Sequence, residues 1–132
     1  MLRRAFILFA VLATVACGTL GGTTRPVTQA ALPPDHYVVF FSPRTAQLAD
    51  DAQMIVRQAA LAVRQRKPSK IEIAVPPAVP GGANVVEGRY TAIQNMISAA
   101  GGDPSVYARV VLSSDAQRLP GGNDRAEIRL LK

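Results

Sequence analysis

The sequence predicts an α/β two-layer sandwich, in which two long helices pack on one sheet. Short runs rich in Val, Ile and aromatic residues alternate along the chain with two segments of helical periodicity. Hydrophobic residues make up 48% of the sequence but aromatic residues only 5%, so we expect a core of aliphatic side chains. Each helix has a single apolar face, and a sheet is the economical partner for two such faces.

The first 16 residues have the pattern of an export signal. Arg3 and Arg4 precede the uncharged run AFILFAVLATVA. This run is too short to span a bilayer as a helix but has the length of a secretory hydrophobic region. We therefore expect residues 1–16 to be a signal peptide.

The only cysteine, Cys17, stands at the end of this run. No second cysteine exists to form an intramolecular disulfide. The segment TVAC resembles the lipobox of bacterial lipoproteins, in which the cysteine is acylated, although Thr14 stands where that box usually has Leu. We expect Cys17 to be lipidated and to anchor the chain to a membrane, the alternative being a signal peptide with an incidental cysteine. Gly18, rather than Asp, after the cysteine is similar to the outer-membrane pattern of enterobacterial lipoproteins.

Residues 17–35 are expected to form the lipidated cysteine and a flexible tether. The segment from residue 18 to residue 34 is rich in Gly, Thr and Pro and has neither helical nor strand periodicity. The folded domain is then expected over residues 36–132.

The first elements of this domain are a strand, a helix and a second strand. The run HYVVFF, residues 36–41, is β-branched and aromatic, which is typical of a buried strand. Apolar residues then recur at three- and four-residue intervals, which predicts a helix that begins near Asp50 and Asp51 and stops at Pro68. The alternating run SKIEIAV, residues 69–75, predicts the second strand.

The second half repeats this pattern and adds a strand. A loop of prolines and glycines precedes a helix expected from about Val85 to Ala100. Gly101 is expected to end this helix as its cap residue, in the left-handed backbone conformation. The run VYARVVLSS predicts a third strand. The segment DAQRLPGGN is expected to be a turn-rich connection, and RAEIRLL, residues 125–131, a fourth strand. The predicted order is strand, helix, strand, helix, strand, strand.

This order resembles the OmpA-like C-terminal domain, the peptidoglycan-associating module of many bacterial envelope proteins. The resemblance rests on YVVFFSPRTAQLADDAQ at the front and NDRAEIRLL at the back, where the family commonly has the patterns x-L-x-x-x-A and N-x-R-x-E-I. In the middle, VVEGRY parallels the family's LSxxRA, and AAGGDP parallels its xxGxDP. The likeness covers about residues 36–131.

The resemblance implies a site for the diaminopimelate side chain of the peptidoglycan stem peptide. In the family, an aspartate after the second strand and an arginine early in the second long helix hold this group. Arg89 matches the arginine, and Asn84 lies near the family's loop asparagine. The aspartate has no counterpart, because no acidic residue lies between Glu72 and Glu87. We expect Arg89, near the start of the helix, to receive a stem-peptide carboxylate; the alternative is an exposed arginine paired with Glu87 or solvent.

The sequence gives little support for catalysis, metal binding or nucleic-acid binding. His36 is the only histidine, so the sequence has few of the side chains that a metal cluster or a catalytic Ser-His or Cys-His pair requires. Fifteen Lys and Arg residues against nine Asp and Glu give a net charge of +6, but the excess is dispersed rather than gathered into basic runs. We expect no enzyme activity, no cofactor, no metal and no nucleic-acid partner.

The predicted function is therefore that of an envelope lipoprotein. It would be anchored by lipid in the outer membrane, with a periplasmic domain that ties this membrane to peptidoglycan. The missing aspartate favours an alternative, in which the domain no longer binds the wall. It would then meet an envelope protein partner, of a secretion or pilus system for example, through its proline-rich loop at residues 76–83.

Overall fold

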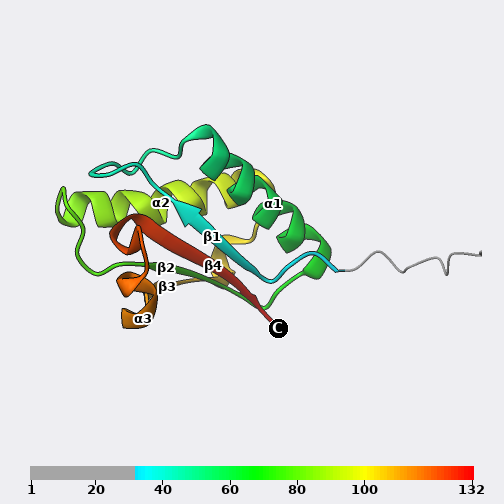
Figure 1. The fold of residues 1–132 in the computed structure, drawn as a ribbon. Helices are drawn as coiled ribbons and strands as arrows, with labels where there is room; N and C mark the ends of the chain where they lie inside the picture. Colours follow the sequence, from blue (N-terminus) through cyan, green and yellow to red (C-terminus); the bar gives the residue numbers. More distant parts are fainter. Residues whose placement is uncertain (1–31) are drawn as a thin grey trace, which may run out of the picture. The chain divides into compact units, whose positions relative to one another are not determined.

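A computed structural model describes residues 32–132, so the predicted signal peptide, Cys17 and most of the predicted tether lie outside the described residues. The described part contains four strands and two long helices, with one short helix and two 3-10 turns (Figure 1). The elements are β1 (His36–Phe40), α1 (Asp50–Arg66), β2 (Lys70–Val75), α2 (Ala83–Ala99), η1 (Pro104–Val106), β3 (Tyr107–Val111), α3 (Ser114–Arg118), η2 (Gly122–Asp124) and β4 (Arg125–Leu131). No helix within residues 32–132 is long and apolar enough to cross a membrane.

The four strands form one mixed sheet in the order β1-β4-β2-β3. β4, the last strand along the chain, lies between β1 and β2 and is antiparallel to both (Figure 1). β2 and β3 are parallel, and α2 provides the crossover that such a pair requires. The predicted two-layer sandwich is confirmed, since α1 and α2 pack on the same face of this sheet.

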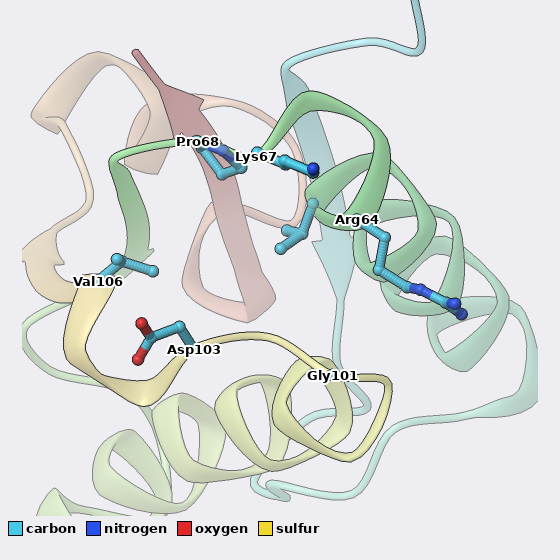
Figure 2. Close-up of a pocket in the computed structure, with 7 residues that line it drawn as sticks. Arg64, Lys67, Pro68, Gly101, Asp103 and Val106 are labelled. Carbon is cyan, nitrogen blue, oxygen red and sulfur yellow. The ribbon is translucent and has the colours of Figure 1, made fainter.

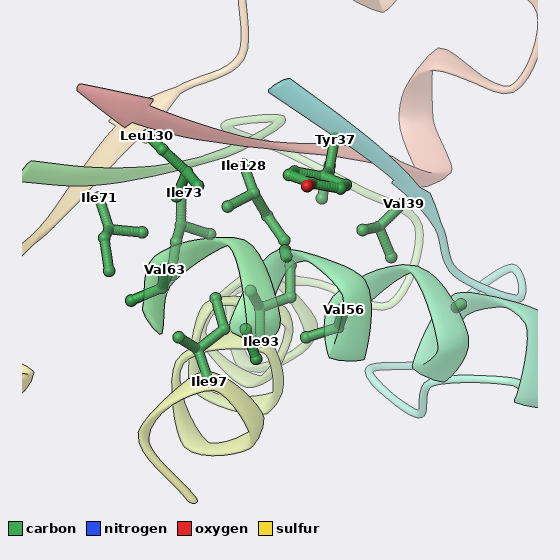
Figure 3. Packing of buried hydrophobic residues seen from close by; sticks show 14 of the residues in the cluster. Tyr37, Val39, Val56, Val63, Ile71, Ile73, Ile93, Ile97, Ile128 and Leu130 are labelled. Atoms are coloured by element: carbon green, nitrogen blue, oxygen red, sulfur yellow. The ribbon is translucent and has the colours of Figure 1, made fainter. Parts of the chain in front are cut away.

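The core lies between that face and the two helices (Figure 3). Ile73 of β2 and Ile128 of β4 are register partners and are completely buried. From the helices, Val56, Ile93 and Ile97 meet them with no exposed surface. Burying each such side chain contributes about 1.5–3 kcal/mol relative to leaving it in water. The aliphatic core that the composition predicts is thus confirmed.

The short helix α3 was not predicted: Ser114 was expected at the end of the third strand and residues 115–118 in a turn-rich connection. Ser113 is the N-cap of α3, and its side chain accepts a hydrogen bond from the backbone N–H of Ala116 at 3.2 Å. Ala116 packs with Ala74 and Leu112 in a second small cluster. A helix of five residues carries too little periodicity to be recognised from sequence.

Residues just before β1 already contact the folded domain. Arg66 Nη1 donates a hydrogen bond to the carbonyl oxygen of Pro33 at 2.7 Å. The N–H of Leu130 donates to the carbonyl oxygen of Asp35, also at 2.7 Å.

At the end of α2, Gly101 has a φ of 98°, as predicted for its position after the helix.

Candidate functional site

Arg89 lies in the first half of α2, and its side chain has no exposed surface. Nε donates to the carbonyl oxygen of Thr45 at 2.9 Å, and Nη1 donates to that of Asn123 at 2.8 Å. Nη2 donates to the carbonyl oxygen of Ser42 at 3.3 Å and to Oδ1 of Asp124 at 2.9 Å. Four of the five guanidinium N–H groups are therefore taken by acceptors within the protein.

The structure does not place Arg89 as predicted, in the open and facing a ligand. The guanidinium carbon lies 4.9 Å from the centroid of the Phe41 ring, and its ion-pair partner is Asp124. Glu87, the partner considered from sequence, is exposed and pairs with Arg109 of β3 instead. Residues two apart on a helix point in different directions, which separates Glu87 from Arg89. Arg89 is an internal clamp that joins α2, the β1–α1 loop and η2, and in this conformation it is out of reach of a stem-peptide carboxylate.

Two glycines allow the surrounding segments to close over Arg89. A Cβ at Gly88 would lie 2.7 Å from the Cβ of Ala46, so α2 approaches the β1–α1 loop at a distance that only glycine permits. A Cβ at Gly81 would lie 2.7 Å from Val85 Cγ2 and 3.3 Å from the carbonyl oxygen of Arg44. The β2–α2 loop and the β1–α1 loop therefore touch. A glycine inside a helical pattern is a sequence signal of close approach, and Gly88 could have indicated this packing.

Asn84 is exposed in the first turn of α2, as a ligand-binding residue there would need to be. Gly82 precedes this helix with a φ of 88° and provides no side-chain cap, and the first turn contains no acidic residue. The positive end of the helix dipole is therefore not neutralised by the helix itself. Arg44, beside Gly81, is also exposed. We call these two exposed polar residues, which lie on segments that approach each other at Gly81, the Asn84–Arg44 rim.

A pocket with a volume of about 370 Å³ lies at the other end of α2 (Figure 2). Arg64 and Lys67 from the end of α1 line it together with Asp103. The backbone N–H of Ser105 donates to Asp103, which lowers the pKa of that carboxyl below its usual value. In Figure 2 the Arg64 side chain extends away from Asp103. Neither Arg89 nor Asn84 lines this pocket.

An ionic cluster lies on the face of the sheet opposite α1 and α2, around Glu127 of β4. Glu127 is only 3% exposed. It accepts hydrogen bonds from Arg125 Nε, Arg129 Nη2 and His36 Nε2, each at 3.0 Å. Burial alone would raise the pKa of Glu127, but these hydrogen bonds outweigh burial and hold the pKa below the ordinary value of 4.5. Within residues 32–132, no three His, Cys, Asp or Glu side chains come together as a metal site would require.

The lowered pKa of Glu127 predicts a loss of stability in acid. A carboxyl whose pKa is lower in the folded chain stabilises it above the unfolded pKa, and this contribution disappears as the pH falls through the folded pKa. Urea unfolding measured between about pH 3 and pH 7 should therefore show declining stability below about pH 4.5. Glu127→Gln should be less stable at neutral pH and should decline less steeply in acid. The same acid slope in both proteins would contradict the assignment.

Comparisons with known proteins show the fold. No protein-family model matches the sequence, and no curated protein matches it. Solved structures do match. The OmpA-like domain of FopA1 from Francisella tularensis is 14% identical, with a TM-score of 0.57 over 74% of this chain and 73% of that chain. The peptidoglycan-associated lipoprotein from Burkholderia pseudomallei is 17% identical, with a TM-score of 0.57 over 70% and 88%.

A third match is described as the cell wall anchor of the type VI secretion system from Pseudomonas aeruginosa. It is 18% identical, with a TM-score of 0.54 over 73% of this chain and 80% of that chain. All three matches pair a low sequence identity with an alignment that covers most of both chains. The described part of this chain therefore has the fold of an OmpA-like domain.

Proposed function

We propose that the protein is a non-catalytic envelope lipoprotein that ties the outer membrane to peptidoglycan. The observation that carries the proposal is the OmpA-like fold, which this chain shares with a peptidoglycan-associated lipoprotein and a cell wall anchor. The lipobox-like segment at Cys17 supports lipid attachment on the membrane side. The domain would lie in the periplasm.

The rim formed by Asn84 and Arg44 is the surface that we propose for the wall. Stem peptides carry carboxylates, and an exposed guanidinium beside the positive end of α2 would attract them. Arg89 would then act as a positioning residue, because it holds the β1–α1 loop that carries Arg44 against α2. No acid replaces the missing aspartate on this rim, so binding would rely on anionic rather than ammonium groups of the wall.

Co-sedimentation of the full chain with purified sacculi tests this proposal. The unaltered chain should sediment with the sacculi, and the double variant Arg44→Ala, Asn84→Ala should bind about tenfold more weakly, because charge-assisted hydrogen bonds are lost. Arg118→Ala is the matched control, since Arg118 is an exposed arginine on α3 whose side chain is 81% accessible. If the unaltered chain stays in the supernatant, the chain does not bind the wall. If the rim variant and the control sediment equally with the unaltered chain, the wall contact lies elsewhere.

The burial of Arg89 favours a second candidate, a scaffold that meets a protein of an envelope complex. The loop between β2 and α2 exposes Pro77, Ala78 and Pro80, while Pro76 and Val79 are buried and hold the loop to the domain. Such a fixed, exposed proline segment is a suitable protein-binding surface, because little conformational entropy is lost on binding. Cross-linking in intact membranes distinguishes the two functions: a scaffold would trap a protein in fixed stoichiometry and would not sediment with sacculi.

A further inference from the structure

Exposed residues recur every three or four positions along α1 and form one stripe on the side turned away from the core. They are Met54, Arg57, Gln58, Leu61, Arg64 and Gln65, which we call the α1 stripe. Met54 is 59% exposed and Leu61 is 55% exposed. Val56 and Ala59, which lie between them in sequence but on the other side of α1, are buried in the core, so on this helix large exposed apolar side chains occur on the stripe.

The α1 stripe is also cationic. Arg57 and Arg64 lie four positions before and three positions after Leu61, which places both next to it on the helix surface. Between Ala52 and Ile71 the chain has five Lys or Arg residues and no acidic residue. Within residues 32–132, neither Arg57 nor Arg64 forms an ion pair with an acidic side chain.

The N-terminal end of the described chain runs beside this stripe. Pro33 and Pro34 line a groove of about 290 Å³ together with Leu61 and Gln58. Leu32, just before them in the chain, is a further large apolar residue and is 65% exposed. Fourteen residues, 18 to 31, separate this point from Cys17, and a fully extended chain of that length spans at most about 50 Å. A lipid on Cys17 would therefore keep the α1 stripe within reach of the bilayer.

We propose that the α1 stripe docks on the surface of a bilayer with anionic head groups. This inference rests on the lipid attachment proposed above. Leu61 and Met54 would enter the boundary between head groups and acyl chains, while Arg57 and Arg64 would pair with lipid phosphates. A second copy of the chain is a poorer occupant, because symmetric contact through this stripe would bring its arginines against each other.

The absence of tryptophan from the sequence makes the docking measurable with one introduced fluorophore. The full lipidated chain carrying Leu61→Trp would be reconstituted into vesicles containing phosphatidylglycerol or only phosphatidylcholine, with and without brominated acyl chains. Val111→Trp is the matched control, because Val111 of β3 is 63% exposed and lies outside the stripe. In phosphatidylglycerol vesicles, Leu61→Trp should emit at shorter wavelength and be quenched by brominated lipid, and Val111→Trp should show neither effect.

Reversal of the charges tests the electrostatic part of the inference. Adding Arg57→Glu and Arg64→Glu to Leu61→Trp should reduce the quenching to the level of Val111→Trp, and so should phosphatidylcholine vesicles. Both arginines are exposed, and an unchanged thermal unfolding curve would show that the fold is intact. The inference would be overturned if brominated lipid quenched Leu61→Trp no more than Val111→Trp. It would also be overturned if the quenching of Leu61→Trp were the same in phosphatidylglycerol and phosphatidylcholine vesicles. A shift to shorter wavelength without quenching by brominated lipid would show that a protein covers the stripe, and would overturn it as well.

Two further measurements separate this inference from the proposed function. Sacculus binding by the charge-reversed variant should equal that of the unaltered chain, since the α1 stripe and the Asn84–Arg44 rim share no residue. If the chain that carries only Leu61→Trp does not dock on the vesicles but still binds sacculi, only the membrane contact is overturned. The second measurement is the mass of the protein purified from cells. A mass without lipid on Cys17 would overturn the proposed lipid attachment itself.

Discussion

Replacing Arg89 by alanine should lower the free energy of unfolding by about 3–5 kcal/mol. The substitution leaves Asp124 without its ion-pair partner and removes the donors of three backbone carbonyl groups, those of Ser42, Thr45 and Asn123. A buried acceptor without a hydrogen-bond donor raises the free energy of the folded state, because no water molecule replaces the lost donor. Urea unfolding at neutral pH measures the difference.

Arg109→Ala is the control for this prediction. Arg109 is also an ion-paired arginine, but its side chain and that of its partner Glu87 are 44% and 61% exposed. Solvent screens such a pair, so its loss should change the free energy of unfolding by about 0–1 kcal/mol. An Arg89→Ala protein as stable as Arg109→Ala would contradict the role of Arg89 as an internal clamp. Any loss of sacculus binding in Arg89→Ala must be interpreted together with its stability.

Replacing Gly122 by alanine should lower the free energy of unfolding by about 3 kcal/mol. A Cβ at Gly122 would lie 2.0 Å from the carbonyl oxygen and 2.5 Å from the carbonyl carbon of Gln117. These are backbone atoms of α3, which cannot move aside as the end of a flexible side chain can. Since Gly122 precedes β4 and η2 carries Asp124, the clash would also disturb the partner of Arg89.

Gly82→Ala separates this steric effect from backbone strain. A Cβ at Gly82 would meet nothing within 4 Å, but its φ of 88° is unfavourable for alanine. We expect Gly82→Ala to cost about 1–2 kcal/mol from the backbone conformation alone. Thermal or urea unfolding of the two variants should therefore rank Gly122→Ala as the less stable protein, and the reverse order would contradict the packing of η2 against α3.

The elements that the sequence predicted well are those defined by local patterns. β4 was predicted with its bounds because RAEIRLL alternates between core and opposite face, and α1 because its apolar side chains keep helical spacing up to Pro68. The position of Gly101 followed from the chemistry of helix ends. In each case the deciding residues lie within one turn or one strand of each other.

The environment of Arg89 could not be predicted in the same way. Its carboxylate partner, Asp124, is 35 residues away, and three of its acceptors are backbone carbonyl groups that any residue could provide. Sequence patterns do not record such acceptors. Expecting the arginine to be accessible therefore relied on the family resemblance alone, whereas the close approach of Gly88 to Ala46 shows how the site is closed.

The place of β4 in the sheet bears on when the chain can acquire its structure during synthesis. β1 and β2 do not pair with each other; each pairs with β4, which follows all the other strands in the sequence. Until β4 is available, β1 has no neighbour in the sheet, and two-stranded remnants of a sheet are marginal in water. The order of strands thus delays completion of the sheet until the last strand has been synthesised, and makes the insertion of β4 between β1 and β2 the decisive step of folding.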